Sequence, residues 1–412
     1  MTVLTERNAT QPPDAGESTG IIAKLLSATA SRDGDLDGVV GEFGVARVGR
    51  VLLDEILFRA CLDDVPLSDG ENASVHVVLE HGGERFSATV SPRHVHVTDE
   101  PDPAGNGAGS LPAPVVTQDL TEVATALYGP AELVTSVTRK IRWPGPGVVF
   151  PTPQRPNLPR AYYDVARRVV QVMERSEQVG LTELAVRYGT DKWSAMHQYT
   201  RNYERHLGPL RDRRLNILEI GIGGFDDPAR GGKSLRSWKH YFPRALVYGI
   251  DILDKHLVDE PRLTTFRADQ SNAAEVTEAA EKWGPFDLIL DDGSHISEHV
   301  IKTFGTLFAR HLRPGGLYII EDLCTSYWPE VFQGDDTDLA DPRYTIGFLK
   351  ALVDGLHHEE LLRPDAREPR PTDTTVSGLH LYHNVAVIEK GSNTEGSVVA
   401  DVFRARRERE GR

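Results

Sequence analysis

The sequence predicts an α/β protein with a mainly parallel sheet, preceded by a smaller α+β domain. Between residues 215 and 320, short apolar runs typical of strands alternate with segments of helical periodicity. Such alternation implies right-handed crossovers and therefore a mainly parallel sheet. Six prolines fall between Pro144 and Pro159. So dense a cluster excludes a helix or a central strand and predicts a boundary between two domains there.

Length and composition favour a soluble, cytoplasmic protein of two or three domains. The chain has 412 residues, of which 39% are hydrophobic and 26% are charged. No apolar run approaches the roughly 20 residues that span a bilayer. Cys61 and Cys324 are the only cysteines, which excludes a disulfide framework and favours a reducing compartment. The net charge of -15 argues against a nucleic-acid partner, because phosphate binding needs a basic face.

The smaller domain is expected over residues 21–145. Residues 1–20 are polar and lack periodicity, so we expect a disordered tail. Within the domain, apolar spacing predicts a helix over residues 51–62 and helical structure over residues 116–142. Alternating residues around His81-Gly82-Gly83-Glu84 predict a hairpin, and residues 101–114 predict a loop. The proline-rich linker spans residues 146–160.

The main domain is expected over residues 161–392, followed by a charged, frayed tail over residues 393–412. It opens with helices between residues 162 and 187. The strands and helices of its core then follow in order over residues 215–220, 234–240, 246–250, 263–267, 273–283, 286–290, 299–311 and 317–320. Residues 377–382 and 385–389 predict a terminal pair of strands.

The first core strand ends in a glycine-rich turn, Glu219-Ile220-Gly221-Ile222-Gly223-Gly224. Gly221 and Gly223 let the backbone approach a ligand closely and permit positive φ. The pattern is not a dinucleotide fingerprint, because Asp226 stands where the third glycine would be. Glu219, an acid before the first glycine, suits a cofactor that carries a positively charged sulfonium.

Polar side chains also follow the next strands, at the edge where open α/β sheets bind ligands. Asp251 follows the second strand and is placed to accept hydrogen bonds from both hydroxyls of a ribose. Asp269 and Gln270 follow the third strand and could bond an adenine amine. With the glycine turn, these positions predict a nucleoside-type cofactor site. Asp291, at the end of the next strand, either faces this cofactor or caps the helix that follows.

Two segments predict a metal site. Asp291-Asp292-Gly293-Ser294-His295 and Ile320-Glu321-Asp322-Leu323 each follow an apolar strand. If these strands are neighbours, their ends lie roughly 5 Å apart. Carboxylates gathered that closely repel one another unless a hard cation lies between them. Asp292, Glu321 and Asp322 are therefore the predicted magnesium ligands. Consecutive strand residues point to opposite faces, so Glu321 and Asp322 converge only if the chain turns there.

His295 is the predicted general base. It lies close to Asp292 on the same loop, and a neutral imidazole can take a hydroxyl proton near pH 7. His299, one helical turn later, is the rival, and we expect a structural role for it. The sequence lacks the thiolate or histidine clusters typical of zinc sites, which argues against zinc.

Several runs carry a resemblance that covers roughly residues 180–390. They are Tyr188-Gly189-Thr190-Asp191-Lys192, His197-Gln198-Tyr199-Thr200-Arg201-Asn202-Tyr203-Glu204, Leu218-Glu219-Ile220-Gly221, Gly249-Ile250-Asp251, Asp291-Asp292-Gly293-Ser294-His295, Arg313-Pro314-Gly315-Gly316, Ile320-Glu321-Asp322-Leu323-Cys324-Thr325-Ser326-Tyr327-Trp328 and Tyr382-His383-Asn384. With these runs the chain resembles the metal- and S-adenosylmethionine-dependent O-methyltransferases of antibiotic deoxysugars. Mycinamicin VI and demethylmacrocin 2-O-methyltransferases and the rhamnosyl O-methyltransferases of polyketide pathways are members.

The resemblance implies a Rossmann-like class I methyltransferase core that uses S-adenosyl-L-methionine and Mg2+. It implies that magnesium held by Asp292, Glu321 and Asp322 chelates two vicinal sugar hydroxyls, and that His295 removes the acceptor proton. It also implies that Tyr199 and the loop over residues 190–192 cover the cofactor. The expected acceptor is a glycosylated natural product, and the expected assembly is a homo-oligomer, often a tetramer.

Three alternatives stay open. The first is an NAD-linked oxidoreductase on the same architecture, which the missing third glycine and the lack of a Tyr-x-x-x-Lys pair in the core disfavour. The second is a non-catalytic scaffold, against which the intact set of acids and histidine argues. The third keeps the chemistry but methylates a catechol or another non-sugar hydroxyl.

Overall fold

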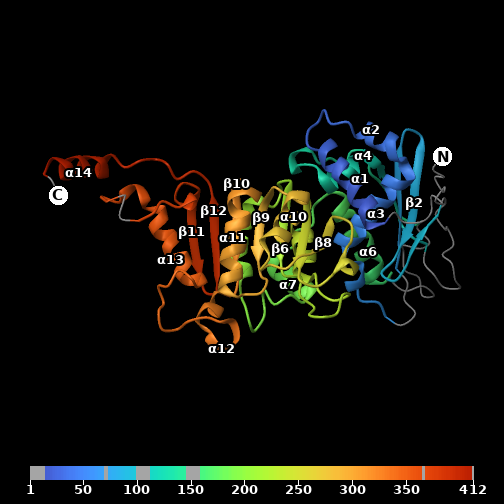
Figure 1. Cartoon of the computed structure of the whole chain (residues 1–412). Coiled ribbons are helices and arrows are strands. Elements are labelled where there is room, and N and C mark those ends of the chain that lie inside the picture. Colours follow the sequence, from blue (N-terminus) through green and yellow to red (C-terminus); the bar gives the residue numbers. More distant parts are fainter. Residues whose placement is uncertain (1–13, 69–72, 99–111, 145–157, 364–366, 411–412) are drawn as a thin grey trace, which may run out of the picture. The chain divides into compact units, whose positions relative to one another are not determined.

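The computed structural model describes residues 14–68, 73–98, 112–144, 158–363 and 367–410. Most of the predicted proline-rich linker and of the predicted loop over residues 101–114 lies outside the described residues. The chain forms two compact units. The first comprises residues 1–180, 209–214 and 240–244, and the second comprises residues 181–208, 215–239 and 245–412. A smaller α+β unit and an α/β unit with a mainly parallel sheet confirm the predicted fold class (Figure 1).

The first unit packs helices against a five-stranded sheet. Its strands, in spatial order, are β3 (Val95–Val97), β2 (Glu84–Val90), β1 (Val75–His81), β4 (Val115–Asp119) and β5 (Lys140–Arg142). β1 and β2 form the predicted hairpin, and Gly82 and Gly83 have positive φ in its turn. Its longer helices are α1 (Ala15–Ala28), α2 (Leu36–Phe43), α3 (Val45–Ala60), α4 (Leu120–Tyr128) and α6 (Arg160–Met173).

Two expectations for this unit are wrong. α1 begins at Ala15, within the predicted disordered tail, because Asp14 caps the helix and its apolar face is buried. Residues 116–142 do not form one helical segment, since their first residues pair with β1 as β4. Asp119 then caps α4 by accepting hydrogen bonds from the backbone N–H groups of Thr121 and Glu122. α6 belongs to the first unit, so the second unit begins at Leu181 rather than at residue 161.

A seven-stranded sheet in the order β11-β12-β10-β9-β6-β7-β8 organises the second unit (Figure 1). Its strands are β6 (Leu215–Ile220), β7 (Ala245–Asp251), β8 (Leu263–Arg267), β9 (Phe286–Asp291), β10 (Leu312–Ile320), β11 (Val376–Tyr382) and β12 (Val385–Lys390). β6 to β10 are parallel to their neighbours in this group, whereas β12 is antiparallel to both β10 and β11. Asp291 pairs with Ile220 on one side and Ile320 on the other, so the carboxyl ends of β6, β9 and β10 meet at one edge.

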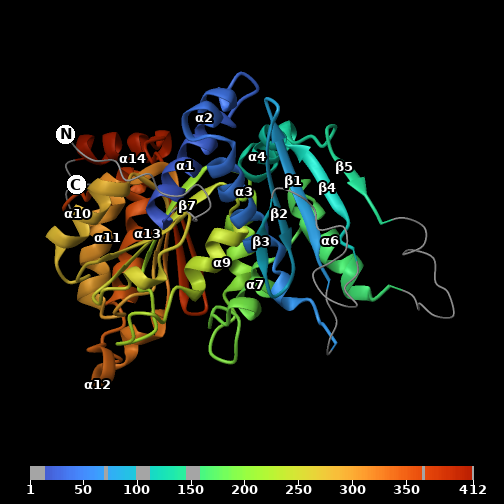
Figure 2. The same cartoon turned by 90° about the vertical axis from the view of Figure 1, so that its right-hand side faces the viewer.

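Helices cover both faces of this sheet. α10 (Ala273–Trp283), α11 (Ser297–His311) and α13 (Thr345–Leu356) lie together on one face (Figure 2). Alternate strand residues, among them Ile220, Tyr318 and Ile320, are buried there against Phe304 of α11. The opposite face, which carries Glu219, meets α8 (Thr200–Leu207) and α9 (Lys233–Tyr241). The alternation along each strand therefore decides which acid at a strand end faces which helical layer.

Some helices of the second unit were not predicted individually. α12 (Pro329–Phe332) and α13 fill the stretch between β10 and β11. α14 (Val398–Arg409) occupies the predicted frayed tail and is capped by Ser397, whose side chain accepts from the backbone N–H of Ala400. α7 (Leu181–Tyr188) opens the unit. In the described part of the chain, every helix is too short or too polar to cross a bilayer.

Candidate active site

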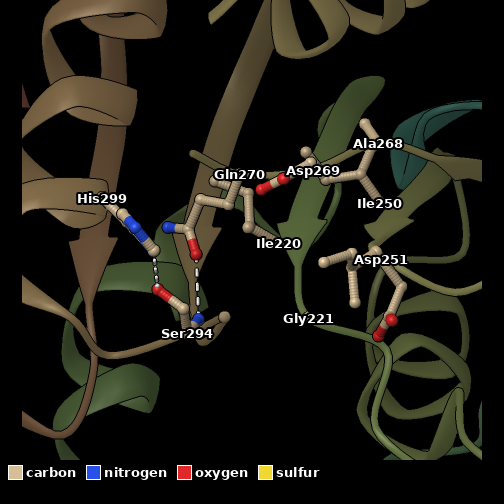
Figure 3. A pocket seen from close by; sticks show the side chains of 11 residues that line it. Ile220, Gly221, Ile250, Asp251, Ala268, Asp269, Gln270, Ser294 and His299 are labelled. Atoms are coloured by element: carbon tan, nitrogen blue, oxygen red, sulfur yellow. Dashed lines mark hydrogen bonds between the residues drawn. The ribbon is translucent and has the colours of Figure 1, made fainter. Parts of the chain in front are cut away.

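The ends of β6, β7 and β8 border a cavity of about 240 Å3 (Figure 3). Four residues predicted to bind a cofactor line it, namely Gly221, Asp251, Asp269 and Gln270. Ser294 and His299, which follow β9, line it as well. The structure thus brings the three predicted strand ends to one hollow at the carboxyl edge of the sheet.

Gly221 allows close packing between the glycine turn and the loop after β9. Its φ is +92°, in the left-handed region that favours glycine, and a Cβ there would lie 2.1 Å from the carbonyl oxygen of Asp292. A side chain at this position would therefore push the Asp292 loop away. Gly223 also has positive φ and lines a second, larger cavity.

Asp251 is held in a fixed orientation at the end of β7. Its Oδ2 accepts from the backbone N–H of Ile222 (2.9 Å), and its Oδ1 accepts from the backbone N–H of Leu253 (3.0 Å). Each carboxylate oxygen has a further lone pair, so Asp251 can still accept hydrogen bonds from a ligand. It lines both cavities.

Gln270 lines the smaller cavity and is hydrogen-bonded to residues at and after the end of β9. Its Nε2 donates to Asp291 Oδ1 (2.7 Å), and its Oε1 accepts from the backbone N–H of Ser294 (2.8 Å; Figure 3). Asp291 is buried, and burial raises its pKa to about 7. Asp291 lines neither cavity and does not cap α11, so it orients Gln270 instead of taking either predicted role.

Asp269 and His299 complete the wall of this cavity. Hydrogen bonds from the Ser271 hydroxyl and backbone hold the pKa of Asp269 below its usual value, so its carboxylate is ionised. His299 Nδ1 shares a hydrogen bond with Ser294 Oγ (3.0 Å; Figure 3). This contact agrees with the structural role expected for His299.

A larger cavity of about 1100 Å3 adjoins the first at Gly221, Asp251 and Gly293. Asp292, His295 and Asp322 line it. Their potential ligand atoms all lie within 4.8 Å of one another. The structure therefore groups the predicted base with two of the three predicted magnesium ligands.

Two residues of this group have left-handed backbone conformations. His295 has φ 57° and Asp322 has φ 53°, a region that non-glycine residues adopt only when their surroundings hold them there. Asp322 turns the chain out of β10 into a 3-10 turn over Leu323–Tyr327. Thr325 Oγ1 lies within hydrogen-bonding distance of the carbonyl oxygens of His295 (3.0 Å) and Asp322 (2.8 Å), which ties the two loops together. The chain therefore turns at Asp322, and such a turn is what convergence of Glu321 and Asp322 on one ion would require.

Glu321 belongs to a second, buried group around Lys192. Lys192 Nζ lies 2.6 Å from Asp292 Oδ2, 2.8 Å from Glu321 Oε2 and 3.6 Å from Glu219 Oε1. Burial alone would lower the pKa of Lys192, but the Asp292 and Glu321 carboxylates raise it well above its usual value. The ammonium is therefore charged, and it neutralises part of the acid cluster.

Glu219 and Glu321 share the face of the sheet that α8 and α9 cover. Burial raises the pKa of Glu219 to about 7 and that of Glu321 well above its usual value, whereas Lys192 opposes both shifts. Glu219 Oε2 accepts from Ser234 Oγ (2.7 Å). Glu219 lines neither cavity. Its carboxylate lies next to the Lys192 ammonium instead.

Two tyrosines at α8 hold the acids that follow β10. Tyr199 OH donates to Asp322 Oδ1 (2.7 Å), and Tyr203 OH donates to Glu321 Oε1 (2.6 Å). Tyr199 is buried behind Asp322, stacks on His197 and lines neither cavity, so no contact of this structure supports its predicted place over the cofactor. His197 Nε2 lies 3.4 Å from Asp322 Oδ1.

Sequence reasoning gave His197 and Tyr203 no role, and it placed Lys192 only in the loop expected over the cofactor, not among the acids. All three lie in the runs that carry the family resemblance. A helical spacing of four residues puts Tyr199 and Tyr203 on one face of α8, and this signal was available in the sequence. The partners of Lys192 come from three different strand ends, and only the fold brings them together.

Known proteins resemble both units of the chain. Residues 22–139 match the family model described as MycE methyltransferase N-terminal. The chain is 50% identical over 302 residues to the 8-demethyl-8-alpha-L-rhamnosyl tetracenomycin-C 2'-O-methyltransferase of Streptomyces olivaceus, which covers 71% of this chain and 76% of that protein. It is 38% identical over 391 residues to the demethylmacrocin O-methyltransferase of Streptomyces fradiae, covering 92% of this chain and 93% of that protein.

A solved structure is similar over almost the same length. It is the MycE methyltransferase from the mycinamycin biosynthetic pathway in complex with Mg, SAH and mycinamycin VI. The TM-score is 0.79 at 34% sequence identity, and the match covers 92% of this chain and 95% of that chain. The similarity therefore extends well beyond the sheet that carries the cavities.

Proposed function

The chain belongs to the family of S-adenosylmethionine- and magnesium-dependent O-methyltransferases that modify antibiotic sugars, and we propose that it methylates a sugar hydroxyl of a glycosylated polyketide. The relative from Streptomyces olivaceus is named for a rhamnosyl tetracenomycin, and the MycE structure contains mycinamycin VI. One observation carries the proposal. Asp292, His295 and Asp322 gather in the wall of a cavity that adjoins the nucleoside-type cavity.

The smaller cavity fits the nucleoside part of S-adenosylmethionine. Asp251 is oriented by two backbone N–H groups and would bind the ribose diol. Asp269 and Gln270 would bind the edge of the adenine ring, since both line the cavity. Gly221 and Gly223 allow the backbone to approach the remainder of the cofactor.

The larger cavity fits a magnesium ion and a sugar diol. Asp292 and Asp322 provide the oxygen ligands that Mg2+ prefers, and the cavity leaves room for hydroxyl or water ligands. Bound magnesium would supply a Lewis acid that lowers the pKa of the acceptor hydroxyl. The role of Glu321 as a ligand stays a prediction. Its two oxygens are hydrogen-bonded by Lys192 and Tyr203, and only a further lone pair of each is left for an ion.

His295 is the proposed base. Its Nε2 lies 3.6 Å from Asp322 Oδ2, close enough for this carboxylate to attract the imidazolium that forms once His295 has taken the proton. The acceptor oxygen would then bond to the methyl carbon of S-adenosylmethionine, while the carbon–sulfur bond breaks and its electron pair stays on sulfur. The side chains around the two cavities would position the acceptor and the cofactor, and such positioning supplies much of the rate of methyl transfer.

A mass-spectrometric assay tests the proposal. The protein is incubated with S-adenosylmethionine and Mg2+ and with rhamnosylated tetracyclic polyketides, macrolide glycosides or a catechol. We expect one methylene to be added to the sugar of a glycoside and nothing to be added to the catechol. Metal-free protein with a chelator is the control. Methylation of the catechol alone, or unchanged turnover in the chelator, would contradict the proposed acceptor or the proposed metal.

The assembly of the chain is a further prediction. We expect a homo-oligomer, with a tetramer favoured by the family resemblance. Light scattering on the full-length protein measures its mass in solution. A monomer at micromolar concentration would contradict the prediction without affecting the proposed chemistry.

A further inference from the structure

A cluster of possible metal ligands lies on the second unit, away from the acids that follow β9 and β10. It consists of His206 near the end of α8, His380 on the edge strand β11 and Glu389 on β12. One potential ligand atom from each lies within 4.8 Å of the other two. The centroids of the two imidazole rings are 4.5 Å apart. We refer to these three residues as the edge cluster.

The register of β11 and β12 explains why two of these side chains meet. His380 pairs with Val387 and Gly378 pairs with Glu389, so His380 and Glu389 are diagonal neighbours on the same face. His380 Nε2 donates to Glu389 Oε1 (2.8 Å). Gly378 leaves the space that the carboxylate fills, because a Cβ there would lie 2.9 Å from Glu389 Oε2.

α8 brings the third side chain. Tyr199, Tyr203 and His206 follow one another at intervals of four and three residues, so they lie on one face of α8. The first two donate to Asp322 and Glu321 beside the active site. His206 Nε2 shares a hydrogen bond with the hydroxyl of Tyr382, two residues after His380 on β11 (2.8 Å). One helix face therefore extends from the acids of the active site to the edge of the sheet.

The donor atoms of the edge cluster suit a different ion from the active site. Two imidazoles and one carboxylate are the ligands of many zinc and other transition-metal sites, whereas Mg2+ prefers oxygen ligands alone. A zinc–nitrogen bond of about 2.0 Å places the donor atoms of a tetrahedral site about 3.3 Å apart. Small side-chain rotations would bring atoms within 4.8 Å to that spacing. The side chains of His380 and Glu389 are each 40% exposed, so an ion and its water ligands can reach the cluster from solvent.

We propose that His206, His380 and Glu389 form a second metal site, selective for a divalent transition-metal ion such as Zn2+ or Co2+. An ion there would join α8 to β11 and β12. Because α8 also carries the tyrosines that hold Glu321 and Asp322, the ion would stabilise one side of the active site without taking part in methyl transfer.

Cobalt binding in the presence of saturating Mg2+ tests the proposal, because Mg2+ then occupies the oxygen-rich site. The untagged, full-length protein is titrated with Co2+ and followed by visible absorption and calorimetry. We expect one Co2+ to bind per chain with nitrogen-containing coordination. His380→Ala and Glu389→Gln should each weaken this binding by at least about tenfold, since removing even a hydrogen-bond partner of a metal ligand typically costs that much.

His256→Ala is the matched control. His256 Nδ1 also contacts a carboxylate, that of Asp254, but both side chains are largely exposed and belong to none of the metal-ligand clusters in the described part of the chain. This variant should bind Co2+ as the wild type does. If His380→Ala fails to fold, Glu389→Gln carries the test, since it keeps the side-chain shape.

Two results would overturn the proposal. One is equal Co2+ affinity in the wild type, His380→Ala and Glu389→Gln, and the other is complete displacement of Co2+ by Mg2+, which would place the ion among the active-site acids. A protein that binds Co2+ at the edge cluster but methylates no sugar would contradict the proposed function alone. The two proposals can therefore fail separately.

Discussion

Replacing Lys192 with methionine removes the buried positive charge from the acid cluster. In the wild type, the ammonium lies 2.6 Å from Asp292, 2.8 Å from Glu321 and 3.6 Å from Glu219. Methionine has similar length and no charge. Glu219 and Glu321 would then be buried without a cation, and Asp292 would lose its closest partner.

The expected cost follows from this geometry. Breaking a buried ion pair by removing one partner costs about 3 to 5 kcal/mol, because it leaves an uncompensated buried charge. Proton uptake offsets part of that cost, since burial raises the pKa of Glu219 to about 7 and that of Glu321 well above its usual value. Without Lys192 both pKa values rise further. When the pKa of a carboxyl is raised in the folded state, the protein loses stability as the pH rises through that pKa. The free energy of unfolding of the variant should therefore be smaller at pH 8 than at pH 6.

Urea unfolding followed by tryptophan fluorescence measures this cost. Four of the five tryptophans, Trp193, Trp238, Trp283 and Trp328, belong to the second unit, so the signal reports mainly on it. Arg406→Met is the control, because Arg406 and Glu410 of the second unit form an ion pair whose side chains are 70% and 41% exposed. Exposed pairs contribute at most about 1 kcal/mol.

Added Mg2+ should restore part of the stability of Lys192→Met, because an ion bound by Asp292 compensates the same cluster. The restoration should exceed the effect of Mg2+ on the wild type. A loss of stability in Lys192→Met no larger than that in Arg406→Met at pH 8 would refute a buried charge at Lys192 as the cause. A loss that did not depend on pH would show that packing, and not charge, is the cause.

The remaining predictions concern the base, the metal and a buried acid. His295→Ala should lower turnover by about 10^2- to 10^4-fold, the usual contribution of a general base, while S-adenosylhomocysteine affinity measured by calorimetry stays nearly unchanged; unaltered turnover would remove His295 from this role. Asp292→Asn should require much more Mg2+ for half-maximal turnover, and a magnesium titration identical to that of the wild type would count against ligation by Asp292. Burial raises the pKa of Asp291 from 3.8 to about 7, so its contribution to stability is complete at low pH and is lost as pH rises toward 7. Asp291→Asn should therefore flatten the dependence of the urea midpoint between pH 4 and pH 7, and an equally steep dependence in the variant would place the titration elsewhere.

Local patterns were enough to predict the strands that position the site. Apolar runs that end in glycine or acid located the carboxyl ends of β6, β7 and β9, and the structure pairs Ile220 and Ile320 with Asp291 at adjacent strand ends. The cavity at these ends contains Asp251, Asp269 and Gln270, whose positions followed from the same reasoning. Each of these predictions used residues that are neighbours in the chain, and strand geometry is sufficient to relate such residues.

Contacts between distant segments could not be predicted in this way. Lys192 precedes the first core strand, and its partners lie at the ends of three different strands, so its role depends on how α7 and α8 pack over the sheet. The edge cluster was missed for the same reason. The sequence argued against zinc because it lacks thiolate or histidine clusters typical of zinc sites, but folding brings His206 next to His380. Sequence spacing is a guide to metal sites only when the ligands share one segment.

The backbone at Asp322 separates the acids that contact Lys192 from the acids that line the open cavity. On a regular strand, Glu321 and Asp322 would point to opposite faces of the sheet. Glu321 keeps the direction expected on a strand and faces Lys192 and Tyr203. The left-handed conformation of Asp322 bends the chain back toward His295 instead. Asp292 lies between the two groups, since its oxygens are close both to the ammonium and to the Asp322 side. The ammonium of Lys192 therefore lies among Glu219, Glu321 and one oxygen of Asp292, while Asp292 and Asp322 line the open cavity where we propose that an exchangeable ion binds.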